Sequence, residues 1–452
     1  AAQAFRAGVI YNTGEVFQFR LAMLITPYVL DEFSTDGVLD KQKVYDFWDN
    51  AERTLNHYYR NDVGIELQVI RDDRLIMTTN DTGIEIMSGG IPNANNGTRI
   101  IDALLTNDGY DVGIMITKST GSLAGKASLG GASSPYRKAD GFAMTSYTTI
   151  AHELGHLFGA THAHEIADGD YTEPGKGHSI MSYGSPRDFF SVSSIRQMRN
   201  LLRNLNVYTN PERTEKDITR NTDVAGTNIV YAYTETGTQP LLDRDLIRKE
   251  YVVTLGSDFQ FYLPLANGET YGEAGVQYCV HGHDLGSELS ANALRSIVKP
   301  ATTGNVMFHK RWADPRTLSA TAPESQYAEA NSGDSRVGKF RFALAARDHS
   351  LYDSEFCDIR VIAGEPFAAT ITSPMNFTLF RPGRALTVTW TPQTDIYGDN
   401  SRVRILLSDD FGQTFPYVLA DGLPNTGTWT GALPYIEIGK KNGKSELGAA
   451  LA

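Results

Sequence analysis

The sequence contains one short segment whose residue types and spacing could hold a metal ion. His152, His156 and His162 occupy the histidine positions of the pattern H-E-x-x-H-x-x-G-x-x-H. Residues four apart share a helix face, so the first two imidazoles can point at one centre. Gly159 can end that helix in a left-handed turn, after which the chain returns the third imidazole. Three imidazoles with a fourth position left open are typical of a catalytic zinc site.

Glu153 gives the same segment a second chemical capacity. It follows the first histidine directly, which places its carboxylate beside a metal-bound water, where it can act as general base. The alternative is an ordinary amphipathic helix with scattered histidines. We prefer the zinc site, because only 10 histidines occur in 452 residues and three of them fall at ligand spacing here.

A second motif follows downstream, where residues 179–184 read Ser-Ile-Met-Ser-Tyr-Gly. Together with the elongated zinc motif, this segment resembles the Met-turn of the metzincin metalloproteases. The resemblance implies that Met181 packs beneath the zinc site without binding the metal. It also implies that Tyr183 binds zinc or hydrogen-bonds the transition state, as a tyrosine does in astacin-like and serralysin-like metzincins. The other interpretation of Tyr183 is a core aromatic residue.

The bulk composition limits the class of protein. A chain of 452 residues is too long for one ordinary core, so we expect two to four domains. No run of 18 or more apolar residues occurs, so we expect no membrane span. A formal net charge of −12 argues against a nucleic-acid partner.

Strand and helix patterns alternate ahead of the zinc motif. A helical stripe of apolar residues runs from Asp40 to Tyr59, and residues 112–117 form an apolar run that fits a buried central strand. Further expected elements are strands at residues 17–28 and 64–70 and helices at residues 99–105 and 189–204. This succession, with the metzincin resemblance, predicts an α/β (α+β) catalytic domain over residues 15–210, preceded by an N-terminal remnant at residues 1–14.

Residues 121–131 are rich in glycine and other small residues. In metzincins the corresponding stretch is an edge strand above the cleft, where an extended peptide adds by β-augmentation. The resemblance therefore implies substrate contacts at four neighbouring residues, Ser122, Leu123, Ala124 and Gly125. The alternative is a flexible loop with no substrate role.

The sequence pattern changes after residue 210 to short strand-like segments separated by Gly, Asn, Asp and Ser. We expect two all-β sandwich domains of immunoglobulin- or fibronectin-like type, at residues 211–366 and 367–440. The second is short for that fold, so its last strands could be missing. Residues 441–452 read as a flexible tail.

Two further features of this downstream part involve cysteines and acidic residues. Cys279 and Cys357 could form one disulfide or remain two buried thiols, and we favour the disulfide. Asp409 and Asp410 could hold Ca²⁺, but a solvated turn is the simpler interpretation, so calcium has no real support.

The resemblance covers most of the chain and is most specific at residues 152–162 and 179–183. It is to secreted reprolysin-like metzincins of Bacteroidetes-type bacteria, in which β-sandwich modules follow the protease. It implies a secreted or cell-surface bacterial zinc endopeptidase, with one catalytic Zn²⁺ and a protein or peptide substrate. The near absence of cysteine departs from animal and venom reprolysins, so their disulfides cannot be carried over. Natural substrate, latency and oligomeric state are not indicated.

Two rival functions stay open at this point. An adhesin or other binding protein could carry an inactive metzincin domain, although such proteins lose the glutamate or a histidine and this chain keeps Glu153, His152, His156 and His162. A zinc enzyme that cleaves something other than peptides is the third interpretation. The expected edge strand favours a peptide substrate over that interpretation.

Overall fold

The structure is a computed structural model of the whole chain. It describes residues 11–118, 123–164, 173, 179–185, 187–203, 205, 207–209, 230–235, 237–245, 247, 249–254, 258–263, 265–266, 276–284, 309–313, 317–321, 338–349, 351–362, 371–374, 383–392, 402–408, 417–434 and 450–451. Within these residues, no helix is long and apolar enough to cross a bilayer.

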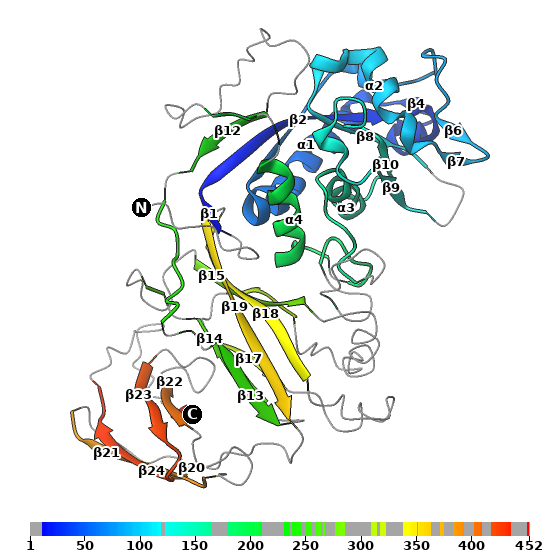
Figure 1. The fold of residues 1–452 in the computed structure, drawn as a ribbon. Coiled ribbons are helices and arrows are strands. Elements are labelled where there is room, and N and C mark those ends of the chain that lie inside the picture. Colours follow the sequence, from blue (N-terminus) through cyan, green and yellow to red (C-terminus); the bar gives the residue numbers. More distant parts are fainter. Residues whose placement is uncertain are drawn as a thin grey trace.

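A twisted mixed sheet forms the centre of the N-terminal region (Figure 1). Its longest strand, β2 (Glu15–Ile25), pairs in parallel with β5 (Ile65–Val69) and with β8 (Val112–Ile116). β8 pairs in parallel with β10 (Gly141–Ala143), and β9 (Gly125–Ala127) pairs antiparallel with β10 at the end of the sheet. Every residue of β8 is buried, as expected for a strand with neighbours on both sides.

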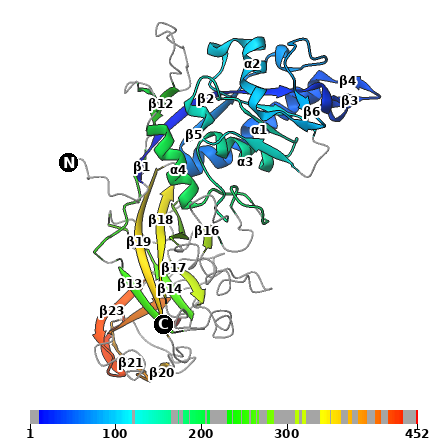
Figure 2. The same cartoon turned by 45° about the vertical axis from the view of Figure 1, so that its right-hand side comes forward.

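Helices cover both faces of this sheet (Figures 1 and 2). On one face, α1 (Lys41–Tyr58) packs beside α3 (Tyr147–Leu157), and α4 (Val192–Arg203) lies near them. α2 (Gly97–Leu105) packs on the other face, where its Ile101 lies against Gly113 of β8. The apolar side chains between these layers form one continuous core.

The expected elements of this region are confirmed with small shifts at their ends. The helix predicted from Asp40 to Tyr59 is α1, and Asp40 caps it by accepting a hydrogen bond from the backbone N–H of Gln42. The strand predicted to reach Tyr28 stops at Ile25, because a 3₁₀ helix, η1 (Pro27–Phe33), begins there. β10, with only three residues, was not anticipated.

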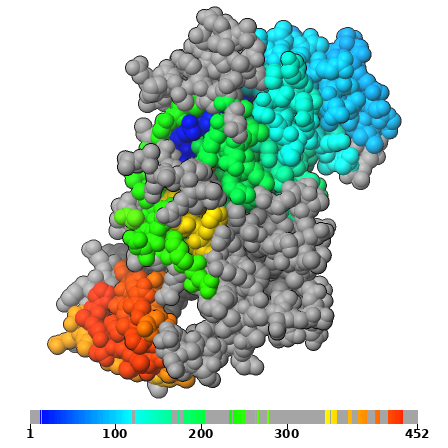
Figure 3. All heavy atoms as spheres, in the orientation of Figure 1, coloured from blue at the N-terminus to red at the C-terminus, as the bar shows by residue number. Residues whose placement is uncertain are grey.

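A second sheet continues below the first. Its path runs β1 (Tyr11–Thr13), β19 (Leu351–Ile362), β18 (Gly338–Asp348), β15 (Val276–Asp284) and β16 (His309–Ala313), and β13 (Glu250–Thr254) also pairs with β19. A separate pair consists of β14 (Asp258–Tyr262) and β17 (Thr317–Thr321). In the space-filling view the yellow residues of this sheet lie between the cyan N-terminal region and the orange C-terminal region (Figure 3).

The two sheets exchange short strands across the predicted domain boundaries. β1 lies within the predicted N-terminal remnant but pairs with residues 351–353 of β19. Beyond residue 210, β12 (Val230–Thr234) pairs antiparallel with residues 15–18 of β2, and β11 (Val207–Thr209) pairs with β12. The N-terminal sheet therefore does not end where the predicted domain ends, and residues 11–13 are not a remnant outside the fold.

The C-terminal region contains two three-stranded sheets. One has the order β20 (Ile371–Ser373), β21 (Ala385–Trp390), β24 (Thr428–Ala432), and the other has β23 (Tyr417–Pro424), β22 (Arg402–Ser408), β25 (Ala450–Leu451). Leu386 and Val388 of the first share a small core with Ile405 of the second. The expectation of a flexible tail over residues 441–452 is wrong at its end, because residues 450–451 pair with β22.

The favoured disulfide is also wrong. Cys279 of β15 lies opposite Ala345 of β18, whereas Cys357 of β19 lies opposite Phe342 of β18. β18 thus separates the two cysteine strands, at about 4.8 Å per strand spacing, and the residues are also offset along the sheet. Bridged cysteines need Cα atoms within about 7 Å, and Cys357 forms no disulfide.

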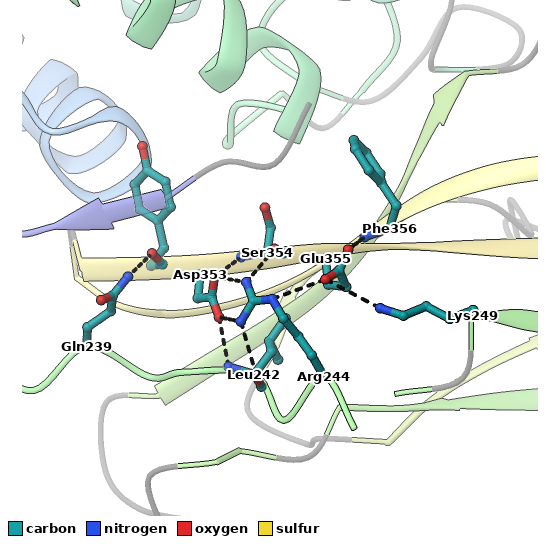
Figure 4. Close-up of polar contacts among 9 residues, drawn as sticks. Gln239, Leu242, Arg244, Lys249, Asp353, Ser354, Glu355 and Phe356 are labelled. Carbon is teal, nitrogen blue, oxygen red and sulfur yellow. Dashed lines mark hydrogen bonds and ion pairs between the residues drawn. The ribbon is translucent and has the colours of Figure 1, made fainter. Parts of the chain in front are cut away.

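Polar contacts hold Gln239, Leu242, Arg244 and Lys249 against β19 (Figure 4). Arg244 donates from Nη1 to Asp353 Oδ2 (2.9 Å) and from Nη2 to Asp353 Oδ1 (2.6 Å). The backbone N–H of Leu242 donates to the same carboxylate (2.9 Å). Glu355, two residues along β19, accepts ion-pair contacts from Arg244 and Lys249. These paired charges fix the loop against the sheet.

Candidate active site

The helix α3 carries the first two histidines and positions them as the spacing predicts. Ser146 caps its N-terminus by accepting from the backbone N–H of Thr149. The helix ends at Leu157, and Gly159 follows with φ of +93°, a left-handed conformation that glycine adopts at little cost. The chain then turns back so that His162 faces the same centre as His152 and His156.

The three imidazoles converge through their Nε2 atoms. His162 Nε2 lies 3.2 Å from His152 Nε2 and 3.0 Å from His156 Nε2. Ligand nitrogens about 2.0–2.1 Å from a tetrahedral zinc are about 3.3 Å apart. Three imidazole nitrogens stabilise one another little at this distance, so the spacing fits a cation shared among them. Three histidines also match the donor set of a catalytic zinc.

Backbone carbonyl groups orient two of these rings from behind. His152 Nδ1 lies 2.7 Å from the carbonyl oxygen of Ile180, and His156 Nδ1 lies 2.8 Å from that of Ala160. A carbonyl can only accept, so Nδ1 carries the proton and the Nε2 lone pair faces the centre. Burial, and next the neighbouring His156, lower the pKa of His152 well below its ordinary value, which keeps the ring neutral.

Glu153 lies beside the histidine centre with its carboxylate nearly enclosed. The residue is 5% exposed, and no donor among the described residues reaches Oε2. Burial raises the pKa of this carboxyl from 4.5 to about 8. A Cβ atom on Gly125 of β9 would come within 2.4 Å of Glu153 Oε1, so the bare glycine backbone leaves the space that the carboxylate occupies.

The segment around Met181 forms the floor of the site. Met181 is fully buried, and its Sδ would lie 2.3 Å from a Cβ on Gly155, so the thioether packs directly against the exposed backbone of α3. The backbone N–H of Ala163 donates to the carbonyl of Met181 (3.1 Å), which joins this floor to the segment that carries the third histidine. The expected packing of methionine beneath the histidines is therefore present.

Tyr183 is not a core aromatic residue. It is 52% exposed, and its hydroxyl lies 3.1 Å from His162 Nε2. Its ring also packs at 4.5 Å, centroid to centroid, from the ring of His164, which is buried. Tyr183 thus stands at the edge of the histidine centre with its hydroxyl directed towards it.

A cleft of about 640 Å³ opens over the histidines and Glu153. The residues 123–127 of the edge segment line one side, and Tyr183 and Arg187 line another. Leu123, Ala124 and Gly125 therefore lie at the cleft as predicted, whereas Ser122 lies outside the described residues. Sequence reasoning missed two basic residues of the lining, Lys126 and Arg187, although each is adjacent or close to a predicted site residue.

Comparison with protein families agrees with this geometry. Residues 50–163 match the sequence model of the metallopeptidase family M12B, reprolysin-like. This segment of the chain is therefore similar to the reprolysin-like metallopeptidases. The match includes Glu153 and the three histidines of the site, and it ends before Met181. No curated protein matches the chain.

Two of the solved structures that match the chain resemble it distantly. Three N-terminal domains of the outer capsid protein Hoc of bacteriophage RB49 are 8% identical, with a TM-score of 0.16, over 46% of this chain and 62% of that one. Chicken CNTN1 domains FN1–FN3 are 9% identical, with a TM-score of 0.15, over 45% and 59%. The chain thus spans less than two thirds of either structure.

Proposed function

We propose that this protein is a zinc-dependent endopeptidase in which His152, His156 and His162 hold the ion. The observation that supports this most directly is the approach of three Nε2 atoms within 4.8 Å of one another, beside a buried glutamate and an open cleft. A zinc ion there would polarise a peptide carbonyl and lower the pKa of a water molecule to about 7.

Glu153 is suited to the proton transfers that peptide hydrolysis needs. Its carboxylate would take a proton from the attacking water as the carbon–oxygen bond forms, and then give it to the amine nitrogen as the carbon–nitrogen bond breaks. A carboxyl whose pKa is raised to about 8 by burial can both accept and return a proton near neutral pH. The hydroxyl of Tyr183 would donate a hydrogen bond to the substrate oxygen as it gains negative charge.

The edge strand β9 offers a backbone template for an extended peptide. The carbonyl of Ala124 accepts from Met144 (2.9 Å), and the N–H of Ser128 donates to Asp140 (2.8 Å), so these groups face the strand β10 side. Alternate residues of an antiparallel strand direct their backbone groups to opposite sides. Gly125 and Ala127 therefore direct theirs to the open side, where a substrate strand would pair.

The charges of the cleft favour one kind of substrate. Among the described lining residues, Lys126 and Arg187 are cations and the buried Glu153 is the only acid, on a chain of net charge −12. We propose that substrates carry acidic side chains near the cleaved bond. These side chains would be attracted by Lys126 and Arg187, whereas the net negative charge of the rest of the protein repels acidic groups.

The sheet-rich parts complete the proposal. We propose that residues 211–366 and 367–440 act as sandwich-type spacer or binding modules after a catalytic domain at residues 15–210, and that the protein is secreted or displayed on a bacterial surface. The shared core of the two C-terminal sheets supports the sandwich assignment for the second module.

The function is tested by incubating a diverse peptide library with the wild type and with Glu153→Ala, each with its zinc content measured. We expect cleavage by the wild type only, at equal zinc, since a positioned general base contributes about 10²–10⁴-fold. Wild-type turnover in Glu153→Ala would refute the role of that residue. Zinc binding without cleavage by either protein would instead favour an adhesin-type binding protein.

A further inference from the structure

An ion pair joins the second sheet to the back of the metzincin domain. Arg347, near the end of β18, pairs through Nη1 with Asp62 Oδ1, and its side chain is only 11% exposed. Gln277 of β15 accepts from Arg347 Nε (3.2 Å) and Nη2 (3.0 Å), which fixes the direction of the guanidinium group. Asp62 lies in a π-helical turn, η2 (Tyr59–Val63), and is 3% exposed.

Asp62 is itself joined to the floor of the histidine centre. Its Oδ2 accepts a hydrogen bond from the backbone N–H of Phe190 (2.7 Å). The carbonyl of the same peptide group, that of Phe189, accepts from the N–H of Ile180 (2.8 Å). The carbonyl of Ile180 in turn accepts from His152 Nδ1 (2.7 Å). A path of hydrogen bonds, which passes through the backbone of Ile180, thus runs from a downstream strand to one histidine.

We infer that Arg347 is a positioning residue for His152, acting through Asp62 and the main chain at Phe190 and Ile180. The inference rests on the proposed zinc site and extends it to a residue outside the metzincin domain. It assigns the second sheet a direct part in shaping that site, beyond spacing or substrate attachment.

The physical reason lies in what Asp62 would do without its cation. A buried carboxylate with no positive partner must move towards water or take up a proton, and either change alters its hydrogen bond to Phe190. That peptide group also holds the N–H of Ile180, and so the backbone of the residue whose carbonyl accepts from His152 Nδ1. The carbonyl in turn fixes the tautomer and the ring angle of His152. Loss of such an outer partner typically weakens metal affinity or activity about 10–100-fold.

The packing of the Phe190 ring adds a second connection between Asp62 and the helix that carries His152. The Phe190 ring lies beneath α3, 3.5 Å from the position of a Cβ on Gly155, and 4.8 Å from the ring of Tyr59, whose hydroxyl donates to the carbonyl of Ala151 (2.6 Å). A shift of Phe190 would therefore disturb the helix turn that carries His152. The imidazole of His156 is oriented instead by the local carbonyl of Ala160.

The inference is tested on the full-length protein with Arg347→Met, Arg347→Lys and the double variant Asp62→Asn/Arg347→Met. The readouts are the zinc dissociation constant from chelator competition, and kcat and KM on a cleaved peptide. Arg244→Met is the matched control, because it breaks a buried ion pair in the same sheet that does not contact Asp62. All measurements are made below each variant's unfolding transition.

We expect Arg347→Met to raise the zinc dissociation constant about tenfold or more and to lower kcat with little change in KM. Arg347→Lys should show a smaller effect, because it keeps the charge but loses the planar fork. The double variant should recover, because the amide oxygen introduced by Asp62→Asn would still accept from Phe190 and no buried charge is left unpaired. Arg244→Met should keep the wild-type zinc affinity.

An unchanged zinc dissociation constant in folded Arg347→Met, or an equal rise in Arg244→Met, would overturn the inference. If Arg347→Met does not fold, Arg347→Lys takes its place, and wild-type zinc affinity in that variant refutes the inference. Zinc affinity is measured without substrate, so the result stands apart from whether the protein cleaves peptides.

Discussion

Glu153 and Asp353 are both buried carboxylates, one in each large sheet region, and their surroundings are opposite. Asp353 is fully buried and accepts from both terminal nitrogens of Arg244 and from the backbone N–H of Leu242 (Figure 4). Glu153 is 5% exposed, and no donor among the described residues reaches its Oε2. One carboxylate is saturated with donors, and the other faces a cleft with an open oxygen.

The difference separates a carboxylate that supports the fold from one that is available for chemistry. A saturated buried carboxylate holds its charge and fixes the backbone around it. A buried carboxylate with too few donors destabilises the folded state. Such a group is retained where function requires a free hydrogen-bond acceptor. Each of the following predictions changes one side of this comparison and leaves the other unchanged.

The largest expected effect is on the pH dependence of stability in the zinc-free protein. The pKa of Glu153 rises from 4.5 to about 8 on folding because of burial. The folded state then binds more protons than the unfolded state between these pH values, so stability falls as pH rises from 4.5 to 8, by roughly 5 kcal/mol at most. Urea unfolding of the zinc-free wild type and of Glu153→Gln at pH 4.5 and pH 8 measures this change. An equal change in the free energy of unfolding between the two pH values in both proteins would contradict the prediction.

The next largest effect concerns Asp353, the carboxylate that is saturated with donors. Arg244→Met leaves Asp353 buried without its cation, and we expect a loss of about 3–5 kcal/mol in the free energy of unfolding of the second sheet. The kcat of the folded variant should stay at the wild-type value, because Arg244 contacts no residue of the cleft. Denaturant unfolding and steady-state kinetics check this, and a kcat loss at unchanged stability would reverse our interpretation of the two carboxylates.

A smaller effect is expected from filling the space beside Glu153. The added methyl of Gly125→Ala would come within 2.4 Å of Glu153 Oε1, so the carboxylate must move. We expect kcat to fall about 10–100-fold with zinc retained, because small displacements of a catalytic group cost that much. Lys126→Ala, at the next position, is the control and should keep kcat. Full activity in Gly125→Ala would show that the carboxylate tolerates displacement.

The smallest effect concerns the charges of the cleft. Lys126 is exposed on the edge strand, and a single cross-strand charge pair contributes about 0.2–1 kcal/mol. Lys126→Glu should therefore raise KM for a peptide with an acidic residue near the cleaved bond by about 1.4-fold to fivefold. KM for the matched neutral peptide should change less. If KM rose more for the neutral peptide than for the acidic one, the basic residues of the cleft would not select acidic substrates.

The histidine centre could be predicted from sequence because its information is local. His152, Glu153 and His156 share one helix, and Gly159 returns the chain within three residues to His162. The amphipathic stripe of α1 and the apolar run of β8 were equally readable, since each pattern directly reflects burial. Roles within the site, such as those of Glu153 and Tyr183, stay predictions until tested.

Contacts between distant segments could not be predicted. No pattern connects Arg347 to Asp62, because their pairing depends on how two sheets pack and not on local periodicity. The strand β10 has three residues and one glycine, too few for a period of two to be visible. The favoured disulfide failed for the same reason, since the intervening strand β18 is apparent only from the register.

The exchange of β1 and β12 between the sheets has a consequence for how the protein is made. During synthesis on the ribosome, the partner of residues 11–13 emerges only with residues 351–353, and β2 gains β12 only with residues 230–234. A gene fragment that ended near residue 210 would encode strand edges without partners, which invite aggregation. Recombination that moved the catalytic region to another protein would have to carry both exchanged strands and β19 with it.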